Sequence, residues 1–294
     1  MSGVTSTLQT NATELVINED IEASKETAMP EATFSTLSLV QSNHVAQITL
    51  NRPEARNALN RLAYSELEQV FRRVQSDKDV RCVVLTGQDP AFCSGDDVKE
   101  LMTGDSVSTH PRLHAVRPQI TPAAAAILDC DRPVIAAVNG AAVGWGMDLA
   151  LMADFRNASE HAKFGELFVK RGLVSDVGGL MRLPRLVGPE KAAELLMTGD
   201  IISGEEALRI GLVLDCVAHE ALLERAGTLA RKIAENPPMA VRYLKEGLRR
   251  SFHGDYHEMG TWVSQTLGIL FQTEDHREGV ASFLEKRAPD FVGR

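Results

Sequence analysis

Two kinds of hydrophobic pattern divide the chain. Short apolar runs rich in β-branched residues, at 81–86 and 133–138, have the length of buried strands, and 36–40 with 44–50 predicts a hairpin. Between these runs, apolar residues recur every three or four positions, as on the buried face of a helix over Leu62–Val74. Strands that alternate with helices indicate an α/β fold.

The last third of the chain has an almost entirely helical pattern. Helices are predicted over 189–198, 204–210, 219–235, 238–251, 256–273 and 276–286, with one strand-like interruption at 212–217. We therefore predict an α/β core over residues 34–205 and a helical C-terminal domain over residues 206–294.

The first 33 residues differ in composition from the rest. They hold six acidic residues, one Lys and no Arg, which is typical of a disordered acidic tail. A secretory signal would need a basic start and an apolar core, and a mitochondrial transit peptide would need Arg; residues 1–33 have neither pattern.

Charge and cysteine usage narrow the class of protein further. The net charge of −9 gives no support for nucleic-acid binding. The four cysteines are far apart without a C-x-x-C pair, which favours free thiols over a disulfide framework or a zinc site. No apolar run approaches the ~20 residues of a membrane-spanning helix. A cytoplasmic protein is the expectation.

Two loops share one design. Ser94-Gly95-Asp96 and Gly144-Trp145-Gly146 each follow an apolar strand and lead into a helix. The first N–H groups of a helix have no partner within it, so two such groups could converge on an oxygen that becomes negative during a reaction. The structural alternative is that the glycines only permit tight turns. Neither loop fits the glycine-rich motifs that bind phosphate.

Several segments in a fixed order carry a family resemblance. They are Ile48–Pro53, Asn57–Asn60, Phe92–Asp97, Pro133–Asp148, Leu183–Arg185 with Val187–Gly188, and Arg277–Gly279 with Phe283–Arg287. With this set, the chain resembles the crotonase superfamily, the enoyl-CoA hydratase/isomerase family, over nearly all of residues 35–294. The resemblance implies a β/β/α spiral core that binds acyl-CoA and a C-terminal trimerisation domain. It also implies trimers, often paired into hexamers, and neither a metal nor any cofactor besides the coenzyme A of the substrate.

The resemblance also implies where the substrate binds. The thioester oxygen would lie in an oxyanion hole made by the backbone N–H groups of Asp96 and Trp145, which would stabilise a thioester enolate. Trp145 stands where the family more often has Gly. Residues placed around the substrate by family position are Arg56, Ala58, Ser94, Gly95, Asp97, Lys99, Gly144, Phe168 and Lys286. The three cations would contact the CoA part, or they are simply solvated surface; residues 104–128 would line the acyl-chain pocket.

The catalytic positions depart from the hydratase pattern. Hydratases of the family hold a water between two glutamates; here the first position is Asp148 and the second is Phe168, which cannot pass a proton. Glu166 is displaced from that position by two residues. Asp176, in an Asp-x-Gly-Gly pattern, resembles the acid–base Asp of family isomerases and also the nucleophilic Asp of family dehalogenases.

These residues lead to a mechanistic hypothesis. Asp176 would move a proton during isomerisation or hydration of an unsaturated acyl-CoA, with Asp148 as a second acid or an orienting group. A pocket lined by Phe168, Trp145 and Met147 would raise the pKa of Asp176 by burial. The structural alternatives are a helix N-cap for Asp176 and a favourable first-turn charge for Asp148.

Two other functions stay open at this point. One is an acyl-CoA hydrolase or dehalogenase in which Asp176 is the nucleophile. The other is a non-catalytic scaffold that binds acyl-CoA.

Overall fold

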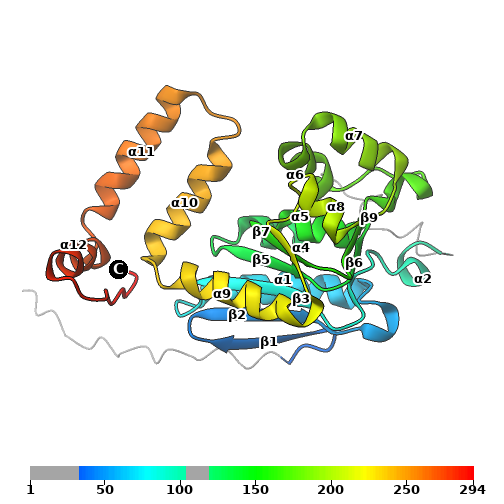
Figure 1. Ribbon diagram of the computed structural model, residues 1–294, viewed down its shortest axis with the longest axis horizontal. Coiled ribbons are helices and arrows are strands. Elements are labelled where there is room, and N and C mark those ends of the chain that lie inside the picture. The colour runs from blue at the N-terminus through cyan, green and yellow to red at the C-terminus, as the bar shows by residue number, and fades with distance from the viewer. Residues whose placement is uncertain (1–32, 104–118) are drawn as a thin grey trace, which may run out of the picture. The chain divides into compact units, whose positions relative to one another are not determined.

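The computed structural model describes residues 33–103 and 119–294 (Figure 1). The predicted tail over residues 1–33 lies almost wholly outside the described residues, as does most of the predicted acyl-chain pocket at 104–128. The chain divides into two units, Met1–Thr33 and Phe34–Arg294, and only the second is considered below. The proposed boundary between residues 205 and 206 stays a prediction.

Two sheets form the core. The larger has the order β1 (Leu37–Ser42), β2 (Val45–Leu50), β3 (Cys82–Gly87), β5 (Val134–Val138), β7 (Phe155–Ser159), β10 (Asp215–Val217). The smaller has the order β4 (Ala91–Cys93), β6 (Ala141–Val143), β8 (Lys163–Gly165), β9 (Ile202–Ser203). Only β1–β2 and β8–β9 pair antiparallel. The predicted hairpin is therefore confirmed.

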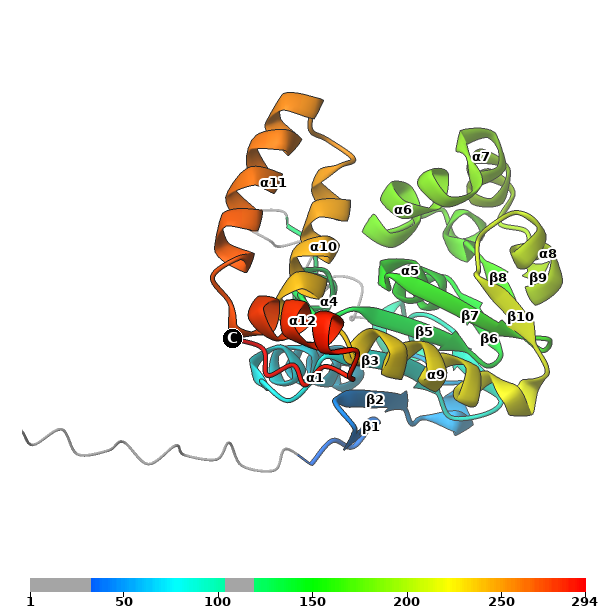
Figure 2. The ribbon, with the colours of Figure 1, turned by 60° about the vertical axis from the view of Figure 1, so that its left-hand side comes forward.

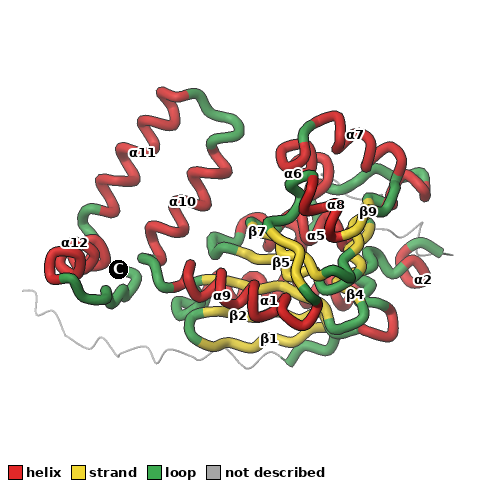
Figure 3. Tube along the Cα trace, viewed as in Figure 1, coloured by secondary structure: helices red, strands yellow, loops and turns green. Residues whose placement is uncertain are grey.

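The helices fill the spaces between and beyond these strands. Their bounds are η1 Pro53–Ala55, α1 Arg61–Ser76, α2 Val98–Leu101, α4 Pro122–Asp129, α5 Trp145–Met152, η2 Leu167–Arg171, α6 Val177–Val187, α7 Pro189–Thr198, α8 Gly204–Arg209, η3 His219–Ala221, α9 Leu222–Ala234, α10 Pro238–Arg250, α11 Tyr256–Leu270 and α12 Glu274–Glu285. After β10 the chain forms helices η3 and α9–α12, and Figure 3 shows α9–α12 in red.

One unit of structure recurs along the core. A strand of the large sheet is followed by a strand of the small sheet and then by a helix, as in β3-β4-α2, β5-β6-α5 and β7-β8-η2. This β/β/α repeat confirms the expected α/β core with a helical C-terminal part.

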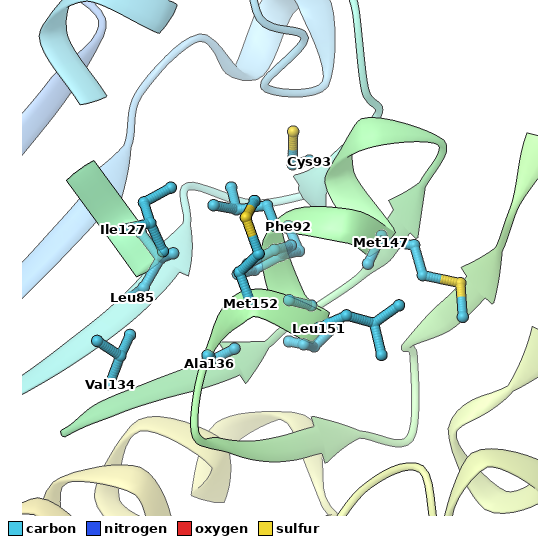
Figure 4. Close-up of a cluster of buried hydrophobic side chains, with 14 of the residues drawn as sticks. Leu85, Phe92, Cys93, Ile127, Val134, Ala136, Met147, Leu151 and Met152 are labelled. Carbon is cyan, nitrogen blue, oxygen red and sulfur yellow. The ribbon is translucent and has the colours of Figure 1, made fainter. Parts of the chain in front are cut away.

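Alternation along the strands divides the core between the two faces of the large sheet. Val83, Leu85, Val134 and Ala136 pack with α1, α4 and α5 in one cluster, part of which Figure 4 shows. Cys82, Val84, Ile135 and Ala137 pack against Leu222, Ala226, Ala230 and Ala234 of α9. Every residue of β3 and β5 is buried because both faces are covered. Figure 2 shows α9 running along the strands.

A buried ion pair joins α10 to the core. Lys245 Nζ lies 2.6 Å from Asp154 Oδ2 and donates to the carbonyl of Arg132 at 2.5 Å. Asp154 Oδ2 also accepts the N–H of Val134, the first residue of β5, at 2.8 Å. Burial lowers the pKa of Lys245, and the charge of Asp154 opposes that shift. The start of β5, the end of α5 and the middle of α10 are thus held at one point.

Two further features bear on the class of protein. All four cysteines have free thiols, as their spacing predicts. Within the described ranges, none of the helices combines the length and the apolar character that crossing a bilayer requires.

Candidate active site

The smaller sheet brings the two glycine loops together. β4 and β6 pair in parallel, with Ala91 beside Ala141 and Cys93 beside Ala142, so both chains leave the sheet at the same edge. Gly95, at φ +86°, lies so close to the second loop that a Cβ there would be 3.1 Å from the backbone nitrogen of Trp145. The convergence expected of the two loops is therefore present in the fold.

Asp96 and Trp145 occupy the positions expected of the N–H donors. Leu59 N donates to Gly95 O at 2.8 Å, and Asp97 N donates to Leu59 O at 2.9 Å. In such a parallel bridge the N–H of the middle residue, Asp96, is directed away from Leu59. Trp145 is the first residue of α5, so no turn precedes it to accept its N–H.

A small cavity lies between the loops. It encloses about 20 Å³, which is room for about one water or one substrate oxygen. Its lining comes from the two loops, from α2 and from η2: Ser94, Gly95, Asp96, Val98, Met102, Gly144, Trp145, Leu167, Phe168, Arg171 and Leu173. Four residues expected around the substrate, Ser94, Gly95, Gly144 and Phe168, therefore meet here.

The remaining residues expected around the substrate do not line this cavity. Asp97 accepts from Glu100 N as the N-cap of α2 and pairs with Arg52 at 3.1 Å, which holds the first loop. Ala58 is buried. The cations Arg56, Lys99 and Lys286 are exposed. Contacts of these three with CoA stay a prediction.

Arg171 is a cavity residue that the sequence reasoning missed. It lies in η2, one turn after Phe168, and makes no hydrogen bond or ion pair with the residues that the structure describes. The only signal for it in the sequence is the basic pair Lys170-Arg171 in a loop after a short strand, which by itself is typical of solvated surface.

Asp148 is fully buried beneath the second loop. Its carboxylate accepts the N–H of Gly179 and, at 3.1 Å, the N–H of Asp176, and the Ser175 hydroxyl donates to it at 3.3 Å. The expectation of an ordinary first-turn charge is therefore incomplete, because this carboxylate fixes the backbone at the start of α6. An orienting role for Asp148 fits these contacts.

Gly178 and Gly179, which follow Asp176, lie too close to Asp148, Ser175 and Glu166 to carry a side chain. A Cβ on Gly178 would lie 2.5 Å from the carbonyl oxygen of Asp148. A Cβ on Gly179 would lie 2.0 Å from the Ser175 hydroxyl and 2.8 Å from Glu166 Oε1. Only residues without a Cβ allow α6 to begin directly over these side chains.

Glu166 is a second buried carboxyl in this cluster. It is 1% exposed, and neither of its carboxyl oxygens has a hydrogen-bond partner among the described residues. Burial, followed by the charge of Asp148, raises the pKa of Glu166 to about 9. Burial also raises the pKa of Asp148, to about 7, although three donors favour its charged form. Near neutral pH, Glu166 is therefore a neutral acid.

Asp176 lies beside this cluster and contacts the second loop. Its Oδ1 accepts from Val177 N at 2.8 Å, so Asp176 is the N-cap of α6, which was the structural alternative to a catalytic role. Its Oδ2 accepts from the indole Nε1 of Trp145 at 3.0 Å. The carboxylate is thus one indole ring away from the cavity, which Trp145 lines and Asp176 does not. A rise in the pKa of Asp176 by burial stays a prediction.

Comparison with known proteins identifies relatives for this arrangement. The sequence model of the enoyl-CoA hydratase/isomerase family matches residues 40–294. The chain is 40% identical to an (E)-benzylidenesuccinyl-CoA hydratase of Thauera aromatica, over 87% of this chain and 99% of that protein. It is 36% identical to a 2,3-dehydroadipyl-CoA hydratase of Escherichia coli K12, over 89% of this chain and 100% of that protein. The crystal structure of an enoyl-CoA hydratase from Bacillus anthracis superposes with a TM-score of 0.81 at 34% identity, covering 88% of this chain and 100% of the other.

Gly179→Ala tests the close approach of α6 to the buried cluster. The new methyl group would overlap the Ser175 hydroxyl, so the free energy of unfolding should fall by about 1–3 kcal/mol in urea titrations. Gly227→Ala, in α9, where a Cβ would meet only the flexible end of Arg231 at 3.3 Å, is the matched control and should gain about 0.5–1 kcal/mol. Equal stability of Gly179→Ala and the wild type would contradict the proposed crowding.

Glu166→Gln tests the neutral acid. The pKa of Glu166 is 4.5 in the unfolded chain and about 9 in the fold. Between these two pH values only the folded state keeps the proton, so the free energy of unfolding falls as pH rises. Gln has no proton to lose, so the variant should gain stability relative to wild type between pH 5 and pH 9, measured by urea unfolding at each pH. The exposed control Glu160→Gln should leave the pH dependence unchanged. Parallel curves for Glu166→Gln and wild type would show that Glu166 is ionised in the fold.

Proposed function

Because the chain belongs to the enoyl-CoA hydratase/isomerase family, we propose that it adds water across the double bond of an unsaturated acyl-CoA, with Asp176 as the acid–base group. The observation that carries the proposal is the meeting of the two loops at a cavity the size of one oxygen atom, with a carboxylate held one indole away. The names of the relatives from Thauera aromatica and Escherichia coli, both hydratases, support hydration as the net reaction.

The proposed reaction follows from the properties of an enolate. The thioester oxygen sits in the cavity and accepts the N–H groups of Asp96 and Trp145, which stabilise the negative charge that develops on it. Asp176 takes a proton from water as the water oxygen bonds to the β carbon. It then returns a proton to the α carbon as the enolate collapses. Water is added, Asp176 is regenerated, and no atom of the protein is oxidised or reduced, so the reaction needs no cofactor beyond the CoA of the substrate.

Asp148 supports this chemistry through the backbone of Asp176. It accepts the backbone N–H of Asp176, and therefore fixes the position from which the Asp176 side chain extends. Its burial keeps it away from the cavity lining. In the proposal Asp148 orients Asp176 and exchanges no proton with the substrate.

Double-bond isomerisation is the second candidate, and Phe168 favours it. This apolar side chain lines the cavity at the position where hydratases of the family place the second glutamate. A site with one carboxylate and an apolar wall can move a proton between the α and γ carbons of an enolate without holding a water.

Turnover in deuterated water separates the two candidates. With crotonyl-CoA, hydration gives a 3-hydroxyacyl product, whereas isomerisation of a β,γ-unsaturated acyl-CoA gives deuterium wash-in and no hydroxyl. Asp176→Asn should lower kcat at least about 100-fold on either substrate, because it removes the proton acceptor. An Asp176→Asn variant with wild-type turnover would refute the assignment. A covalent acyl-enzyme would favour the nucleophilic alternative instead.

We further propose that α10–α12 form the interface of a homotrimer or of a dimer of trimers. These helices and the turns that join them carry large apolar side chains that the single chain leaves exposed: Leu244, Leu248, Phe252, Val263, Leu267, Ile269, Phe271, Val280, Phe283 and Leu284. So many exposed large apolar side chains on three consecutive helices are typical of a surface that a partner covers.

Light scattering after size-exclusion chromatography tests the proposed trimer. The expected mass is three or six times the 32.0 kDa of one chain. Phe283→Glu, which puts a charge on the exposed apolar surface of α12, should shift the mass toward one chain. The matched control Val40→Glu, at an exposed apolar position of β1, should not. A monomeric wild type would refute the proposal.

A further inference from the structure

The side chains of the two oxyanion-hole residues are joined through Tyr64. Tyr64, in α1, donates its hydroxyl to Asp96 Oδ1 at 2.5 Å. The same tyrosine ring meets the indole of Trp145 edge-on, with ring centroids 4.9 Å apart and planes at 77°. One residue from a distant helix therefore contacts a side chain from each of the two glycine loops.

The indole continues this network to the acid–base group. Trp145 is 2% exposed, and a buried indole N–H needs an acceptor. That acceptor is Asp176 Oδ2, at 3.0 Å. The indole ring cannot rotate away without losing both the hydrogen bond and the edge-to-face contact with Tyr64. The direction of the N–H, and with it the direction of the Asp176 carboxylate, is thus fixed by packing.

We propose that Trp145 and Tyr64 act through their side chains as positioning residues, which hold the Asp176 carboxylate in its charged form and in one orientation beside the oxyanion hole. This inference rests on the proposed role of Asp176. Trp145 then serves twice: its backbone N–H faces the thioester oxygen, and its side chain orients the acid–base group.

The hydrogen bond from the indole also affects the charge of Asp176. A hydrogen bond donated to a carboxylate favours the charged form and lowers its pKa. The acidic groups that face Asp176, Asp148 from α5 and Glu166 from the turn before η2, act in the opposite direction when charged. Removing the indole N–H takes away one donor to Oδ2 and leaves the N–H of Val177 on Oδ1. The pH below which Asp176 becomes protonated should then rise.

Trp145→Phe separates the two roles of this residue. The backbone N–H remains while the indole N–H is lost. On crotonyl-CoA, kcat should fall about 10- to 100-fold, the size of one hydrogen bond to a charged group. The acid limb of the profile of kcat/KM against pH should move to higher pH, and KM should stay within about twofold. Tyr64→Phe, which keeps the ring and removes the hydrogen bond to Asp96 Oδ1, should give a smaller fall in kcat with the acid limb nearly unchanged; Tyr64→Leu should give the full shift.

The chain contains a matched control. Tyr243 and Trp262 form a second edge-on pair, with centroids 6.5 Å apart, on α10 and α11. Trp262→Phe and Tyr243→Leu should leave the pH profile at its wild-type position.

The outcomes are distinguishable. A Trp145→Phe enzyme with wild-type kcat and pH profile, or one in which only KM rises, would overturn the inference and leave Trp145 as a wall of the pocket. If Trp145→Phe does not fold, as judged by circular dichroism, Tyr64→Leu decides in the same way. If Asp176→Asn itself turns over normally, the proposed function fails before the inference is reached.

Discussion

The parallel pairing of β4 with β6 is the contact on which the site depends. Two strands that pair in parallel leave the sheet at one edge, and each continues here into a loop that begins a helix. Neither loop by itself makes a site for a charged oxygen, because one N–H donor stabilises it much less than two. The close approach at Gly95 shows how little space separates the loops. The catalytic geometry is therefore a property of the sheet more than of either loop.

Behind the loops, the fold buries carboxyl groups at a cost in stability. Asp148 is compensated by N–H and hydroxyl donors, whereas Glu166 has no hydrogen-bond partner within the described part of the chain. Burying an uncompensated polar group is unfavourable, and the usual response of an acid is to keep its proton. Such groups concentrate at functional sites, where charge placement matters more than stability. The carboxyl cluster thus supports the location of the active site independently of the glycine loops.

Much of the fold could be predicted from the sequence, because it follows from local patterns. The apolar runs at 81–86 and 133–138 predict β3 and β5. The short strands β4 and β6, whose pairing brings the two loops together, were not predicted because three residues carry too little pattern. Tyr64 could not be predicted, since a tyrosine inside an amphipathic helix looks like any half-buried residue until the partner of that helix face is known. The same holds for Glu166, whose sequence position says nothing about its burial. Asp176 was found only through a family resemblance, and its contact with Trp145 needed the structure.

The ion pair between Lys245 and Asp154 gives α5 a second fixed end. The helix begins at Trp145, beside the cavity, and Asp154 follows shortly after its last residue, Met152. One short, fully buried helix therefore runs from the wall of the cavity to the ion pair that holds α10. A rigid rod fastened at both ends transmits displacement along its axis. A displacement of α10 that moved Lys245 would therefore act on the end of α5 opposite Trp145.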